Sequence, residues 1–154
     1  MAAYFLDSSC LVKRYVKEAG SNWTTNLHRP SSKNWLYVSS LAEVEVISAL
    51  ARRRKGLHIS IHSANKSITR FQRNFEKRFL IVEATIDVLK QAASLADTHE
   101  LRGYDAVQLA SAIKANLNRQ NQNVSNLIFV SADNKLNSAA QTEGLQIENP
   151  NNYP

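Results

Sequence analysis

The sequence is short of cysteine and of long hydrophobic stretches, and both shortages narrow the kinds of protein it can encode. Cys10 is the only cysteine among the 154 residues, which excludes a disulfide within the chain and fits a reducing compartment such as the cytoplasm. No apolar run approaches the roughly 18 residues of a membrane-spanning helix. The first residues also lack a basic segment followed by a long apolar one, so we expect no signal peptide and no membrane association.

Several common functional patterns are missing as well. The sequence has no glycine-rich loop that could wrap a phosphate, and no serine–histidine–aspartate or cysteine–histidine arrangement stands out. His58 and His62 are four residues apart, but a helix cap at Ser60 would leave His58 outside the helix, which disfavours a zinc site. No repeat or interdomain linker is present. We therefore expect one domain over residues 1–148, followed by a loose tail over residues 149–154.

Acidic residues are scarce in one part of a chain whose net charge is +6. From Arg52 to Arg78 there are nine lysines and arginines and a single acid, Glu76. A helix capped by Ser60 and running to about Phe79 is predicted here. Four of its basic residues, which we call the basic stripe, recur at helical spacing: Lys66, Arg70, Arg73 and Lys77. We predict that the basic stripe contacts RNA or an acidic partner, with a simple solvated face as the alternative.

Short apolar runs alternate with amphipathic segments along the chain. The runs predict buried strands at about 4–6, 36–38, 80–82, 127–130 and 145–147. Apolar residues spaced three and four apart predict helices at about 8–16, 21–28, 42–55, 60–79, 85–98, 104–118 and 134–143. The residues expected to face inward from the helix at 85–98 are Ile86, Leu89, Ala93 and Ala96. Strands that alternate with helices favour a parallel sheet covered on both faces, so the predicted fold class is α/β.

Four carboxylates could meet at one edge of that sheet. Asp7 and Asp133 directly follow two predicted strands, and Asp105 and Glu45 lie near the starts of two helices. The carboxyl ends of parallel strands form the edge where ligands bind in such folds. Carboxylates about 4 Å apart repel by roughly 4 kcal/mol per pair at an effective dielectric constant near 20, so a cluster needs protons or a cation. Mg²⁺ or Mn²⁺ would suit these oxygens and could activate water against a phosphodiester.

Each carboxylate also has a plain structural explanation. Asp105 could simply favour the dipole at the start of its helix, and Asp133 could form a turn after its strand. Glu43 competes with Glu45, because the two side chains lie almost opposite each other on a helix and their spacing does not choose between them. Taken together, four acids and a separate basic face are what a metal-dependent nuclease requires.

The segments that carry these acids resemble the PIN-domain family, most closely its bacterial VapC-type toxin branch. The resemblance covers nearly the whole chain and rests on residues 4–9, 11–13, 38–50, 102–110 and 129–133. It implies a single PIN-like domain with a five-stranded parallel sheet of order 3-2-1-4-5. It also implies a ribonuclease that depends on Mg²⁺ or Mn²⁺, with an RNA substrate, a small antitoxin as partner, and a homodimer.

The resemblance also implies roles for particular residues. It favours Glu45 over Glu43 and implies a catalytic quartet of Asp7, Glu45, Asp105 and Asp133. Of these, it implies Asp7, Asp105 and Asp133 as metal ligands. Ser9 and Ser131 match hydroxyl positions that support the acids.

Two other functions compete with the ribonuclease. One is a non-catalytic PIN scaffold that binds RNA or a partner, which would not need four acids. The other is a receiver-like signalling domain, but the sequence has no lone strand-ending aspartate paired with a downstream strand-ending lysine. A receiver would also leave the basic stripe unexplained.

Overall fold

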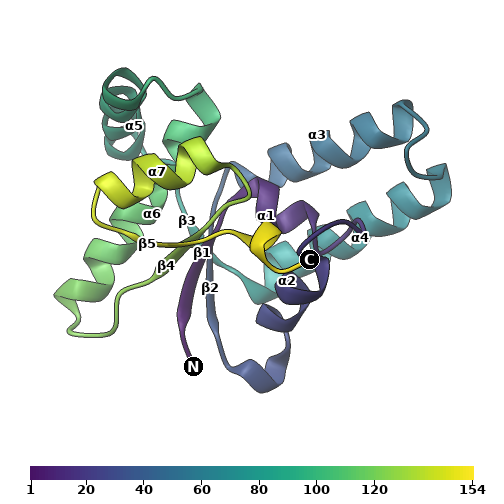
Figure 1. Ribbon diagram of the computed structural model, residues 1–154, viewed down its shortest axis with the longest axis horizontal. Helices are drawn as coiled ribbons and strands as arrows, with labels where there is room; N and C mark the ends of the chain where they lie inside the picture. Colours follow the sequence, from purple (N-terminus) through teal and green to yellow (C-terminus); the bar gives the residue numbers. More distant parts are fainter.

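Five parallel strands form the centre of the computed structural model, which describes residues 1–154 (Figure 1). The strands are β1 (Ala3–Leu6), β2 (Trp35–Ser39), β3 (Leu80–Val82), β4 (Ile128–Val130) and β5 (Gln146–Glu148). Their order is β3-β2-β1-β4-β5, and every neighbouring pair is parallel. The predicted α/β class, the parallel sheet and the strand order are confirmed.

Helices cover both faces of the sheet because the central strands β1 and β4 carry buried apolar side chains on both sides. The α-helices are α1 (Ser8–Val12), α2 (Ser21–Leu27), α3 (Ala42–Lys55), α4 (Ile61–Arg78), α5 (Ile86–His99), α6 (Gly103–Asn121) and α7 (Asn134–Thr142). Leu6 and Val130 belong to a core shared with α1 to α4, whereas Phe5 and Phe129 belong to a core shared with α5 to α7. This alternation follows from the two-residue period of a strand.

Three predicted helices differ in extent or orientation from those in the structure. The first ends at Val12 because the next residues turn more tightly, with the amide of Tyr15 donating to the carbonyl of Val12. α6 continues three residues beyond 118, and its buried Arg119 donates to the Ser125 carbonyl. The face predicted to be buried on α5 is wrong: Val88, Ala92 and Leu95 are buried, while Ile86 and Leu89 are exposed. Both faces of α5 satisfy the helical period, and packing against α6 selects the first set.

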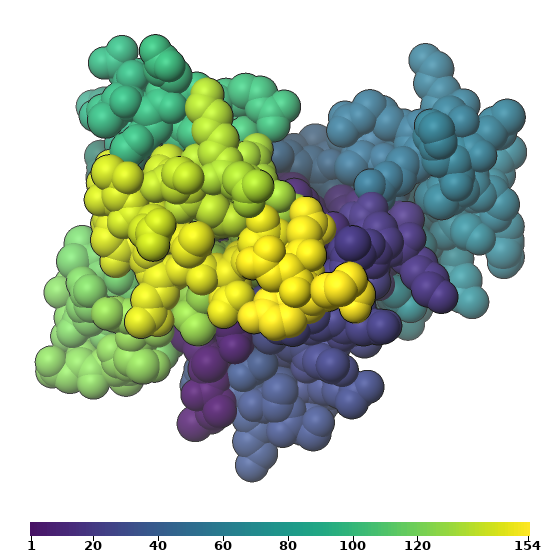
Figure 2. Space-filling view, in the orientation of Figure 1, coloured from purple at the N-terminus to yellow at the C-terminus, as the bar shows by residue number.

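The C-terminal tail lies against the early part of the chain through one aromatic contact. Its residues Pro150–Asn152 form one 3₁₀ turn, η2, and the ring of Tyr153 stacks on that of Trp23 with centroids 4.8 Å apart. Figure 2 shows these last residues, in yellow, against the dark early part of the chain. Gly20 permits this close approach, because its φ is +84° and a Cβ there would lie 2.4 Å from the carbonyl oxygen of Pro150.

The central strands bring distant parts of the chain to one edge. β1 and β4 are neighbours, with Leu6 opposite Val130, so the residues that follow both strands emerge together. α3 enters from the β2 side and α6 from the opposite helical layer (Figure 1). The carboxyl edge is therefore the meeting point of four sequence segments. No helix combines the length and the apolar character that crossing a membrane would require.

Candidate active site

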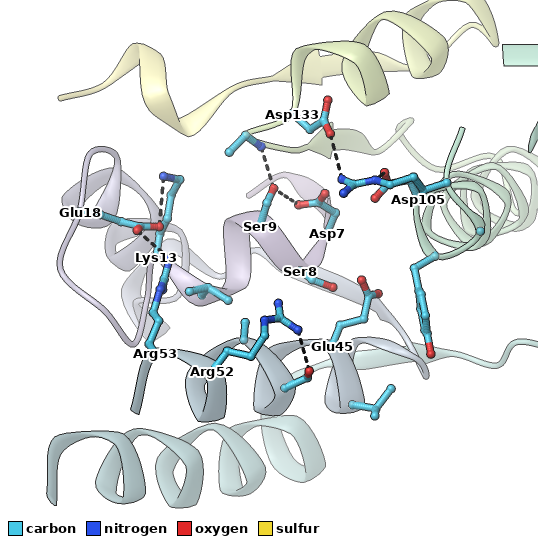
Figure 3. Close-up of a pocket in the computed structure, with 18 residues that line it drawn as sticks. Asp7, Ser8, Ser9, Lys13, Glu18, Glu45, Arg52, Arg53, Asp105 and Asp133 are labelled. Atoms are coloured by element: carbon cyan, nitrogen blue, oxygen red, sulfur yellow. Dashed lines mark hydrogen bonds and ion pairs between the residues drawn. The ribbon is translucent and has the colours of Figure 1, made fainter. Parts of the chain in front are cut away.

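A cleft of about 550 Å³ opens at the carboxyl edge of the sheet (Figure 3). Its walls come from α1, α3, the start of α6 and the turn between β4 and α7. All four predicted acids line it: Asp7, Glu45, Asp105 and Asp133. Glu43 does not line the cleft, so the structure places Glu45 at this edge and turns its competitor away.

Asp7 is the most enclosed of these acids, with 4% of its surface exposed. Its Oδ1 caps α1 by accepting from the amide of Cys10 at 3.1 Å. The hydroxyl of Ser9 donates to Oδ1 at 2.6 Å, and that of Ser131 donates to Oδ2 at 2.8 Å. Both predicted hydroxyl residues therefore touch the carboxylate of Asp7, which joins the ends of β1 and β4.

Burial raises the pKa of Asp7 to about 6, from an ordinary value of 3.8. Hydrogen bonds from Ser9, Cys10 and Ser131 lower this pKa, and the charge of Asp105 adds to the rise. No lysine, arginine or histidine forms an ion pair with Asp7. A buried, oxygen-rich group without a cationic partner is chemically suited to a hard divalent ion.

Asp105 and Asp133 share one basic neighbour, Arg102. Its Nε donates to Asp105 Oδ2 at 3.2 Å, and its Nη2 lies 3.8 Å from Asp133 Oδ2. Asp133 also caps α7, since its Oδ1 accepts from the amides of Lys135 and Leu136. The turn-forming role considered for Asp133 is thus present in the structure, alongside its place in the cleft.

The acids share a cleft but do not form a ready-made metal cluster. No three carboxylate, imidazole or thiolate groups are close enough together to hold an ion. Arg102 instead pairs with two of the acids, Asp105 and Asp133.

Gln108 is a site residue that sequence reasoning missed. It is 1% exposed on α6, and its Nε2 donates to Glu45 Oε1 at 2.6 Å and to the hydroxyl of Ser8 at 3.0 Å. Its Oε1 is buried without a partner. Burial raises the pKa of Glu45, and the hydrogen bond from Gln108 opposes that rise. The signal in the sequence was a polar residue one turn after Asp105, within an otherwise apolar helix face.

We expect Gln108→Met to raise the pKa of Glu45 further, because methionine fills a similar volume and donates no hydrogen bond. A carboxyl ¹³C titration of Glu45 measures this pKa directly. Gln120→Met is the matched control, since Gln120 lies exposed on the same helix. An unchanged or lower pKa for Glu45 in Gln108→Met would contradict the assigned hydrogen bond.

Basic residues that the sequence analysis did not single out line the other end of the cleft. Lys13 is buried, and its Nζ donates to the carbonyl of Ala19 and to Glu18 Oε1. Arg53 donates to the second oxygen of Glu18 at 3.1 Å. Arg52 completes this basic wall of the cleft. By contrast, no residue of the basic stripe on α4 lines the cleft.

A family model for the PIN domain matches residues 4–141. The chain belongs to the PIN-domain family. The match includes all four cleft acids and ends before the C-terminal tail. Among curated proteins, the chain is 34% identical over 113 residues to "Ribonuclease VapC45" of Mycobacterium tuberculosis, which covers 73% of this chain and 76% of that protein.

Solved PIN-fold structures extend the comparison to the whole chain. VapBC2 from Rickettsia felis, bound to a DNA fragment from its promoter, superposes with a TM-score of 0.63 at 17% identity, covering 96% of this chain and 98% of that one. VapC20 from Mycobacterium tuberculosis, a toxin that cleaves the sarcin–ricin loop, gives a TM-score of 0.61 at 16% identity, covering 88% and 94%. At these identities the likeness concerns the fold, which is the one described above.

Proposed function

We propose that this PIN-domain protein is a metal-dependent endoribonuclease and the toxin of a VapBC-type toxin–antitoxin pair. The observation that carries the proposal is the single cleft that receives Asp7, Glu45, Asp105 and Asp133 from four separate segments. A buried Asp7 without a cationic partner adds to it. The similarity to the VapC45 ribonuclease and to the VapBC2 and VapC20 structures supports the same reaction and biological role.

The oxygen donors of the cleft have the chemistry that Mg²⁺ or Mn²⁺ prefers. Asp7, Asp105 and Asp133 would hold the ion through carboxylate oxygens, the ligands that these metals prefer. When bound, it would lower the pKa of water and polarise the phosphodiester. Ser9 and Ser131 orient the Asp7 carboxylate.

Glu45 is the proposed proton acceptor of the cleft. Burial raises its pKa toward the range where a carboxylate accepts a proton more readily, and Gln108 holds its Oε1 in place. Release of Arg102 from Asp105 and Asp133 would free both carboxylates for the ion and leave a guanidinium at the rim for phosphate.

The proposed partners follow from the relatives and from the surface charge. Solved relatives include toxin–antitoxin complexes from Klebsiella pneumoniae and Haemophilus influenzae, which favour a small antitoxin as partner. The basic stripe is exposed on α4, and contact with RNA or an acidic partner stays a prediction for it. Arg70 in that stripe also donates to the Arg14 carbonyl at 2.9 Å, so part of its role is structural. The homodimer likewise stays a prediction.

The decisive experiment is cleavage of a labelled RNA panel by purified protein freed of metal with EDTA. We expect discrete products on addition of Mg²⁺ or Mn²⁺ and none without a divalent ion. Cleavage that is equally fast in EDTA would contradict the metal-dependent mechanism. RNA binding without cleavage under every metal condition would favour the alternative, a PIN scaffold that binds without cutting.

A further inference from the structure

Four basic side chains line the cleft, and three of them form ion pairs with acids of this chain. Lys13 and Arg53 share Glu18, at 3.3 and 3.1 Å. Arg102 pairs with two of the cleft carboxylates. Arg52 is the exception, because no carboxylate lies within 4.0 Å of its guanidinium. Arg52 is therefore the only basic side chain of the cleft that forms no ion pair.

The guanidinium of Arg52 is held in place by a neutral group. Its Nη1 donates to the hydroxyl of Ser48 at 2.8 Å, which leaves the other N–H groups of the fork free. Figure 3 shows the side chain of Arg52 pointing from α3 toward Ser8 and Glu45, which line the same cleft. An arginine oriented in this way presents a charged fork that matches the geometry of a phosphate.

The position of Arg52 along α3 relates it to the acids. Glu45, Ser48 and Arg52 follow one another at spacings of three and four residues, and all three line the cleft. Seven residues of helix separate Glu45 from Arg52, a rise of about 10 Å. A polyanion whose cleaved bond lies at the acids would therefore place a neighbouring phosphate, rather than the reacting one, beside Arg52.

We propose that Arg52 and Ser48 form a phosphate-binding subsite for the RNA backbone next to the scissile bond. This inference rests on the proposed ribonuclease function and names where that substrate is held. A solvated arginine near a helix C-terminus is the competing explanation, since a positive charge there favours the helix dipole. Arg54 distinguishes the two explanations, because it is also near the C-terminus of α3 but lies outside the cleft. It lies on the same helix, donates to Asn65 rather than to an acid, and does not line the cleft.

The test measures binding of an RNA oligonucleotide by fluorescence anisotropy over a range of salt concentrations, in EDTA so that the proposed metal-dependent cleavage does not occur. Arg52→Gln should weaken binding on the order of tenfold at low salt and reduce the slope of log affinity against log salt by about 0.7. The weakening should be similar across oligonucleotide sequences. Arg52→Lys should retain most of the slope, and Arg54→Gln should change it by less than half as much.

Equal slopes for Arg52→Gln and Arg54→Gln, or a wild-type slope for Arg52→Gln, would overturn the subsite. Because the oligonucleotide is bound without metal and without cleavage, this result is separate from the ribonuclease assay. If the protein cleaves RNA with metal but Arg52→Gln leaves the salt slope unchanged, the subsite is rejected and the nuclease is retained. An Arg52-dependent slope in a protein that never cleaves RNA supports the subsite and removes the nuclease.

Discussion

Asp7→Asn should reduce metal-dependent RNA cleavage by at least about a hundredfold while leaving the protein folded. The asparagine keeps an oxygen for the amide of Cys10 and the hydroxyl of Ser9, so the local hydrogen bonds of α1 survive. It removes the negative charge proposed to hold the ion, and charge stabilisation by a metal accounts for several kcal/mol of catalysis. Single-turnover cleavage at saturating RNA measures the effect. Asp97→Asn, an exposed substitution on α5, is the matched control.

The same substitution should stabilise the metal-free protein at neutral pH. Because burial raises the pKa of Asp7 to about 6 in the folded state, ionising it opposes folding. This loss of folding stability in the wild-type protein is absent below about pH 4, where Asp7 is protonated in both the folded and the unfolded state. It grows as the pH rises from about 4 to about 6 and is complete above about pH 6. The raised pKa of Asp7 lowers the free energy of unfolding at neutral pH by roughly 2 to 3 kcal/mol.

The unfolding temperature in EDTA measures this loss of stability. Asp7→Asn should unfold at a higher temperature than wild type at pH 7.5, and the difference should shrink toward pH 4. Mg²⁺ should stabilise wild type and leave the variant unchanged, since an ion stabilises only the state that binds it. A variant that cleaves RNA at the wild-type rate would refute the proposed role of Asp7. A lower unfolding temperature at pH 7.5 would instead refute the burial argument.

Glu45→Gln should lower cleavage by about 10² to 10⁴-fold, the usual contribution of a general base. The amide oxygen of the new glutamine can still accept from Gln108, so the loss comes from the missing proton acceptor rather than from misfolding. Glu43→Gln should stay within about threefold of wild type, because Glu43 faces away from the cleft. The two substituted positions lie two residues apart on α3, so the pair of variants tests directly which face of this helix borders the cleft.

The pH dependence of cleavage provides a second measurement for Glu45. Burial raises the pKa of this carboxyl, so wild-type activity should fall on the acidic side as Glu45 takes up a proton. Glu45→Gln has no proton to gain there and should lose that limb of the profile. A strong loss of activity in Glu43→Gln with normal activity in Glu45→Gln would mean that Glu43, and not Glu45, takes part in cleavage.

Much of the fold could be predicted because its rules are local. Runs such as Tyr4–Leu6 are too short for a helix, and their alternation with helices required a parallel sheet. Parallel strands gather their carboxyl ends at one edge, so the sequence predicts that Asp7 and Asp133 lie together. The strand order itself, and the choice of Glu45 over Glu43, came from the family resemblance rather than from the residue pattern.

The remaining features depend on contacts between segments far apart in the chain, which no local pattern encodes. The amphipathic period of α5 allows two buried faces, and only its packing on α6 selects Val88 over Ile86. Tyr153 stacks on Trp23, which lies 130 residues earlier in the sequence. The local composition of the tail gives no sign of this contact.

Within the cleft, the positions of Asp7 and Asp133 after two strands could be predicted from the residue pattern, whereas the charge environment of the acids depends on the folded structure. A carboxylate behind a strand is visible in the sequence, but its burial, and hence its raised pKa, depends on neighbours from other segments. The same holds for the hydrogen bond from Gln108 to Glu45 and for Glu18, which pairs with Lys13 and Arg53 but not with Arg52. Pairing of charges is a property of distances in space, and residues as far apart as Glu18 and Arg53 acquire those distances only when the chain folds.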